Sequence, residues 1–87
     1  MTPKLAKQNG YTFFFYSNEP LAKEPAHVHV GGERGEMKVW LENLEIAECF
    51  GIPNHDQNKI IKIIKDNKEK FLSVWNEYKE RGKQKQL

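Results

Sequence analysis

The chain has 87 residues, of which 38% are hydrophobic and 30% are charged, and its formal net charge at pH 7 is +2. This length is enough for one small domain, and the single cysteine, Cys49, excludes a disulfide within the chain. The sequence contains no run of about 18 apolar residues and no signal-like first segment, so we expect a cytoplasmic protein without a membrane span.

The first sixteen residues divide into a polar segment and an aromatic one. Residues 1–10 end in Asn9-Gly10, which predicts a loose leader closed by a turn. Residues 11–16, Tyr-Thr-Phe-Phe-Phe-Tyr, are strongly β-prone and place aromatic side chains on both faces of a strand. A strand that is apolar on both faces is normally covered on both, and one helix covers only one. The second face therefore suggests an intermolecular contact, either with a partner protein or in a homodimer.

The sharpest chemical pattern is the alternation of histidine and valine over residues 27–30. It follows a loop, residues 17–25, that carries Glu19 and Glu24. Alternation with period two predicts a strand on which His27 and His29 share one face, about 6–7 Å apart along the chain. Both rings are able to titrate near neutral pH and to bind metals.

Residues 31–35 are turn material, and residues 36–42 alternate again, which predicts a hairpin. A one-residue slip would put a valine opposite a lysine, so matching of the apolar faces sets the register, with Val30 opposite Met37 and Val28 opposite Val39. The other face of the hairpin is the predicted functional surface, and it carries His27, His29, Glu36, Lys38 and Trp40. In this register the cross-strand pairs on that face are His27 with Trp40 and His29 with Lys38.

The C-terminal half is dominated by a helical pattern. Residues 44–50 form a further segment whose type the pattern leaves open. From Asn54, an N-cap candidate with Gln57 three positions later, apolar residues recur at helical spacing and predict one long helix over residues 54–81. Asn67 interrupts the apolar stripe and needs a hydrogen-bond partner if it is buried. Gly82 predicts the helix end, and residues 82–87 a frayed basic tail that gives only weak support to nucleic-acid binding.

Strands followed by a helix, without a repeat or a linker, predict one α+β domain over residues 1–87. We expect a small antiparallel sheet of three to four strands within residues 11–50, packed by one long C-terminal helix.

Four segments of the chain form a recognisable series: Phe-Phe-Phe-Tyr-Ser-Asn-Glu at 13–19, Glu-Pro-Ala-His-Val-His-Val at 24–30, Glu-Met-Lys-Val-Trp-Leu at 36–41, and Phe-Leu-x-x-Trp-Asn-Glu-Tyr at 71–78. Their order resembles that in a bacterial family of short proteins known as domain of unknown function 4160, although the loop at 20–23 is longer here than the usual spacing. The resemblance implies a compact strand-rich domain with a C-terminal helix. It also implies a neighbouring gene for a small partner, sometimes in toxin–antitoxin-like pairs, and it carries no established activity.

Our leading hypothesis is an interaction module of a toxin–antitoxin-like or regulatory pair that binds a co-encoded small protein. The face that carries His27 and His29 would act in this binding. Its predicted binding residues are Trp40, Glu36, Glu19 and Arg34.

Three alternatives remain open for the two histidines. In a small RNA- or DNA-cleaving toxin, they would act as acid and base while Lys38 stabilises developing negative charge. In a metal-binding protein, they would need a third ligand from Glu19, Glu24, Glu36 or His55. None of these lies at a diagnostic spacing, so we assign no metal and no cofactor. In a purely structural role, the rings would pack against Trp40 and Tyr16 and form hydrogen bonds to the backbone or to glutamate.

Overall fold

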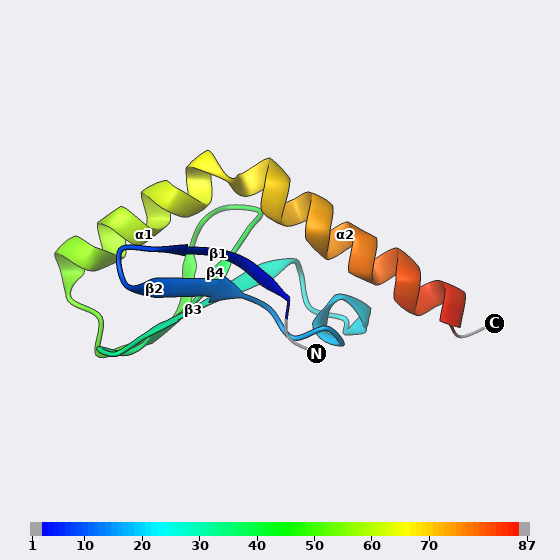
Figure 1. The fold of residues 1–87 in the computed structure, drawn as a ribbon, viewed down its shortest axis with the longest axis horizontal. Helices are drawn as coiled ribbons and strands as arrows, with labels where there is room; N and C mark the ends of the chain where they lie inside the picture. The colour runs from blue at the N-terminus through cyan, green and yellow to red at the C-terminus, as the bar shows by residue number, and fades with distance from the viewer. Residues whose placement is uncertain (1–2, 86–87) are drawn as a thin grey trace.

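The computed structural model describes residues 3–85, which form a five-stranded antiparallel sheet with two helices over one of its faces (Figure 1). The strands lie in the sheet in chain order: β1 (Lys4–Gln8), β2 (Tyr11–Phe14), β3 (His27–Gly32), β4 (Glu36–Trp40) and β5 (Ile46–Phe50). The helical elements are a short 3-10 helix η1 (Glu19–Leu21), α1 (Asn54–Asp66) and α2 (Lys68–Lys85). The predicted α+β class is confirmed. The expected numbers of three to four strands and one helix are wrong.

The additional strand lies in the segment that the sequence predicts to be a loose leader. β1 pairs with β2 across the turn at Asn9-Gly10, with Gln8 opposite Tyr11. Both turn residues have positive φ, 54° and 79°, which is the backbone conformation that Asn-Gly favours in two-residue hairpin turns. Only Leu5 of this edge strand is buried, so its hydrophobic pattern is weak. Residues 1–2 of the expected leader lie outside the described residues.

The predicted register of the central hairpin is confirmed at every position. β3 and β4 pair His27 with Trp40, Val28 with Val39, His29 with Lys38, Val30 with Met37 and Gly31 with Glu36. Residues 44–50, whose secondary structure the sequence pattern leaves open, contain β5, which pairs with β4 and forms the second edge of the sheet. β2 ends at Phe14, two residues earlier than predicted, because the chain turns there toward η1.

The core lies between the helices and one face of the sheet. On the sheet it contains Phe13, Val28, Val30 and Val39, all essentially without solvent exposure. The helices contribute a stripe of four buried side chains: Ile60, Ile64, Phe71 and Trp75. Phe13 contacts Phe71, with ring centroids 6.1 Å apart, so the two layers meet through aromatic rings as well as aliphatic ones.

The predicted single helix is broken at Asn67, where Figure 1 shows a bend between α1 and α2. The Asn67 side chain donates a hydrogen bond to the Ile63 carbonyl at 2.8 Å, and its backbone N–H also bonds to carbonyls of the last turn of α1. An asparagine that satisfies these carbonyls ends a helix. The apolar stripe continues on both sides, so the sequence period alone did not indicate the break.

Both predicted helix ends need correction. Pro53, not Asn54, occupies the N-cap of α1, and Gln57 donates to the Ile52 carbonyl at 2.7 Å instead of closing a capping box. α2 continues past Gly82 to Lys85. Gly82 packs against the Leu21 side chain of η1, where a Cβ would collide with it, so this glycine permits a close approach instead of ending the helix. Residues 86–87 of the predicted tail lie outside the described residues.

Candidate functional site

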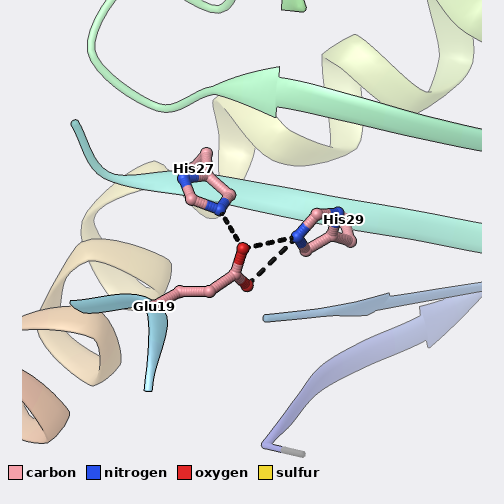
Figure 2. A group of neighbouring side chains, drawn as sticks. All are labelled: Glu19, His27 and His29. Atoms are coloured by element: carbon pink, nitrogen blue, oxygen red, sulfur yellow. Dashed lines mark hydrogen bonds and ion pairs between the residues drawn. The ribbon is translucent and has the colours of Figure 1, made fainter. Parts of the chain in front are cut away.

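Three side chains from the two ends of one loop converge on a single point (Figure 2). The His27 Nε2 atom lies 2.6 Å from Glu19 Oε2, and the His29 Nε2 atom lies 2.9 Å from the same oxygen and 3.0 Å from Oε1. We call Glu19, His27 and His29 the triad. Their contacting atoms all lie within 4.8 Å of one another. The sequence predicts the histidine pair as neighbours on one face, and the structure adds a carboxylate between them.

Local structure explains why the carboxylate reaches the histidines. The alternation of β3 directs both rings to the face opposite the core side chains of Val28 and Val30, and at the start of the strand Trp75 of α2 still reaches the ring of His27. Glu19 opens η1, and its Oε1 atom accepts a hydrogen bond from the Tyr16 backbone N–H at 2.7 Å. Pro20 is buried next to it, and η1 packs against α2. The chain between β2 and β3 therefore folds back over the start of β3.

His27 is the sealed member of the triad. Its side chain has no solvent exposure and packs edge-on against Trp75 of α2 and Trp40 of β4, with centroid distances of 4.9 and 5.7 Å. Its Nδ1 atom lies 3.0 Å from the Pro25 carbonyl oxygen. A carbonyl only accepts hydrogen bonds, so the Nδ1 atom must be the protonated donor. The Nε2 atom is consequently the one available to bind a cation or a second proton.

His29 is the accessible member of the triad, with 21% of its side chain exposed. Its ring stacks on Phe14 at 5.5 Å and contacts Tyr16 at 5.3 Å. It also lines a hollow of about 190 Å³ on the uncovered sheet face, together with Phe14, Tyr16, Glu36 and Glu48. The site is therefore closed on the His27 side and open on the His29 side.

Lys38 and Trp40 continue the same face toward the next strand, as predicted. The Lys38 ammonium group lies 4.7 Å from the centre of the Trp40 ring and donates a hydrogen bond to Glu24 at 3.1 Å. These contacts direct the ammonium group to the loop and the indole. The nuclease hypothesis needs this group to face a phosphate beside the histidines, so that role requires Lys38 to leave Glu24.

The remaining predicted binding residues do not all lie beside the triad. Glu36 lies on the triad face and lines the hollow beside His29. Arg34 lies at the hairpin tip, beyond the far end of β3 from His27, where its guanidinium group is 3.8 Å from Asp56. His55, one of the candidate third ligands, is also bound to Asp56, at 3.2 Å. The structure thus assigns Arg34 and His55 to a different part of the surface from the triad.

Two electrostatic effects act on Glu19 in opposite directions. Burial raises the pKa of the Glu19 carboxyl group, but the hydrogen bonds from His29, from the Tyr16 backbone and from His27 lower it more. The net result is a pKa below the ordinary value, so the group is a carboxylate at neutral pH. A largely buried carboxylate that faces two imidazoles is stabilised by positive charge between them, supplied by protons or by a metal ion.

The contacts expected for a purely structural role of the two histidines are also present. His27 packs against Trp40 and bonds to the backbone, His29 contacts Tyr16, and both bond to glutamate. Sequence reasoning missed Phe50, which is 67% exposed on the triad face, because the type of its segment was left open. It included Glu19 only as one of several candidates, since no spacing rule connects a 3-10 helix to a strand eight residues later.

The sequence that forms these elements matches a known family. The family model described as Domain of unknown function (DUF4160) matches residues 10–76. The chain belongs to this family. The match includes β2, η1, the whole triad and the central hairpin of the DUF4160 chain, and it ends within α2. Searches for similar curated proteins and for similar solved structures give no match.

The helices of the DUF4160 chain are amphipathic and charged. Over the described residues, neither α1 nor α2 is long and apolar enough to cross a membrane.

Proposed function

We propose that this DUF4160 protein is an interaction module that binds a protein partner through the sheet face that its helices leave uncovered. The partner is a small protein encoded beside it, in a toxin–antitoxin-like or regulatory pair. The single observation that supports this is the aromatic character of that face. The pairing itself rests on what the family resemblance implies.

Several large apolar side chains on or beside this face lie open to solvent. Phe50 of β5, which pairs with Glu36, is 67% exposed, and Tyr16 is 50% exposed. Phe14 and Trp40 lie between them in the sheet and are half-buried. Exposed large apolar side chains that gather on one face mark interaction sites, and interaction hot spots are enriched in tyrosine and tryptophan.

The polar groups of this face favour a partner with both apolar and charged contacts. Lys38 lies over Trp40, and Glu36 and Glu48 line the hollow next to His29. Charges around an apolar centre orient a partner and set its register more than they add affinity. β5 is also an edge strand, so its outer backbone groups are available for pairing.

The first test introduces the same carboxylate at two exposed positions on different faces of the protein. Phe50→Glu places a carboxylate in the aromatic surface, and the matched control Asn58→Glu places one on exposed α1. Each variant is co-expressed with the protein encoded next door and analysed by copurification and by size-exclusion chromatography with light scattering. We expect Phe50→Glu to abolish the complex and Asn58→Glu to retain it.

Light scattering also separates the possible partners. If the wild type forms a homodimer that Phe50→Glu abolishes, then the partner on this face is a second copy of this chain and not a co-encoded protein. A wild-type protein that remains a monomer at high concentration and copurifies with nothing would refute the proposal.

A phosphodiester-cleaving toxin is the second candidate, because His29 is accessible on the same face as Lys38. His29 would then be the acid–base group, and buried His27 would only position it through Glu19. Cell growth on induction tests this role. Toxicity that persists unchanged in the His27→Ala plus His29→Ala double variant would eliminate it.

A further inference from the structure

We propose that the triad of Glu19, His27 and His29 is a binding site for one divalent transition-metal ion, of the kind represented by zinc. This inference is independent of the protein partner, because it depends on the geometry of three side chains and not on the aromatic surface. It also reverses the sequence-based expectation that no metal is bound.

The donor atoms already surround one point. Both Nε2 atoms and the Glu19 carboxylate lie within 4.8 Å of one another, and each histidine contacts the carboxylate at 2.6–3.0 Å (Figure 2). Zinc bonds of about 2.0–2.2 Å place tetrahedral donor atoms about 3.3 Å apart. To admit the ion, the histidine–carboxylate pairs need to separate by about 0.3–0.7 Å, and the two imidazole nitrogens, which lie within 4.8 Å of each other, need to approach by up to about 1.5 Å.

The orientation of His27 is the one that metal ligation requires. Its Nδ1–H group donates to the Pro25 carbonyl, so Nε2 is the atom directed at Glu19, and an ion that displaced the Nε2 proton would meet the nitrogen lone pair there. Metal-binding histidines usually donate their other ring N–H group to a carbonyl or a carboxylate, and this second contact fixes the tautomer and the ring plane. The backbone of Pro25 supplies this contact two residues before the ligand.

The other two ligands are also held in place before any ion arrives. The Tyr16 backbone N–H group holds one carboxylate oxygen of Glu19, and η1 is anchored against α2. The His29 ring is supported by Phe14 and Tyr16. Because neighbouring groups fix each ligand, little conformational entropy is lost when the ion binds.

The composition of the site selects the class of ion. Two neutral imidazoles and one carboxylate suit zinc or ferrous iron, whereas magnesium and calcium prefer oxygen ligands. A thiolate does not take part, since Cys49 pairs with Met37, whose side chain belongs to the buried core on the other side of the sheet. Three protein ligands leave at least one coordination position open, which is the arrangement of catalytic rather than structural zinc sites.

The open position would face the hollow beside His29. His27 is sealed by the two tryptophan rings, whereas Glu19 and His29 are 17% and 21% exposed. A water molecule or another small ligand would therefore approach the ion from the His29 side, next to the hollow of about 190 Å³ that His29 lines. The competing arrangement is an ion pair in which protons alone occupy the space between the three groups.

Metal titration of the untagged full-length protein distinguishes the two arrangements. The protein is treated with EDTA, exchanged into metal-free buffer and titrated with Zn²⁺ in competition with a chromogenic chelator. Cobalt is added in parallel, because its visible absorption spectrum reports nitrogen ligands and coordination number. The ligand variants are His29→Ala and Glu19→Gln, and the matched control is His55→Ala, which removes an exposed histidine outside the triad.

We expect one Zn²⁺ per wild-type chain and a cobalt spectrum typical of four or five ligands. His29→Ala and Glu19→Gln should weaken zinc binding on the order of 100-fold or more, since even a second contact to a metal ligand is worth 10–100-fold. His55→Ala should bind like the wild type. Circular dichroism shows whether each variant is folded, and the wild-type stoichiometry decides the question even if a variant is not.

Two results would overturn the proposal. One is a wild-type protein that binds no stoichiometric Zn²⁺ or Co²⁺. The other is binding that His55→Ala weakens as much as His29→Ala does, because such binding would come from scattered surface histidines. In either case the triad is a proton-bridged ion pair.

Discussion

Removing the Glu19 side chain should destabilise the fold far more than removing a neighbouring glutamate. Glu19→Ala leaves the Nε2 atom of His27 without its partner at a position with no solvent exposure. A buried polar group that loses its partner costs about 1–3 kcal/mol, more when it is charged, and breaking a buried ion pair costs about 3–5 kcal/mol. The rest of Glu19 is partly exposed, so we expect a loss of about 3 kcal/mol in the free energy of unfolding.

This loss is large for a domain of 87 residues. The total stability of such a domain is about 4–13 kcal/mol, and each kcal/mol corresponds to about 4–8 °C in the melting temperature. Glu19→Ala should therefore melt about 12–24 °C below the wild type. The matched control is Glu24→Ala, whose carboxylate is half exposed and pairs with Lys38, so its loss should stay below about 1 kcal/mol.

Urea unfolding in the presence of EDTA measures both variants without any contribution from a metal ion. Trp75 and Trp40 contact His27, so tryptophan fluorescence reports on the triad directly, and circular dichroism reports on the helices. A Glu19→Ala variant within about 0.5 kcal/mol of the wild type would refute the reasoning. It would mean that His27 finds another partner or water, and that the triad does not hold η1 on the sheet.

Three further predictions follow from single contacts. Folding lowers the pKa of the Glu19 carboxyl group below its ordinary value of 4.5. The ionised carboxylate therefore stabilises the fold above pH 4.5, and this stabilisation is lost as the pH falls through the folded-state pKa. Urea unfolding at several acidic pH values should show that acid lowers the free energy of unfolding less for Glu19→Gln than for the wild type. In Gly35→Ala the new Cβ would collide with the backbone carbonyl of Phe50, so β5 must move and we expect a loss of more than about 2 kcal/mol by urea unfolding. Asn67→Ala removes the hydrogen bond to the Ile63 carbonyl and should cost about 1 kcal/mol in the same assay, whereas an unchanged stability would show that the backbone bonds alone end α1.

The sequence predicts the central hairpin well, because apolar and polar side chains alternate along its two strands with a period of two residues. The register of β3 and β4 follows from matching valines with Met37 and Val39, because a slip by one residue would have moved every apolar side chain to the other face. That register also brought His27 next to Trp40 and His29 next to Lys38. Alternation alone therefore predicts two of the three triad residues and their neighbours Lys38 and Trp40.

Local signals for the remaining elements were present but weak. The turn Asn9-Gly10 is a strong hairpin signal, yet β1 buries only Leu5 and so lacks the alternation that identifies a strand. The break at Asn67 follows from one side-chain hydrogen bond, which an uninterrupted helical stripe conceals. Such single contacts decide where elements begin and end without changing the hydrophobic pattern.

The position of Glu19 depends on contacts that are distant in sequence. η1 lies over His27 because it packs on α2, where Gly82 accommodates Leu21. No spacing between Glu19 and the histidines expresses that contact. Alternation in the sequence therefore predicts that His27 and His29 lie together, but it leaves four candidates for the third member of the triad.

His29 connects the two proposals, since it belongs to the triad and also lines the hollow on the uncovered sheet face. A protein bound to that face would cover the open side of the triad, and a metal ion would fix the His29 ring that the protein contacts. If the metal ion and the protein partner bind to the same chain, each changes the affinity of the chain for the other by the same factor, because a single coupling free energy links the two binding events. Partner affinity measured with Zn²⁺ and with EDTA gives this factor. A ratio of one would place the partner away from His29, on the β5 side of the face around Phe50.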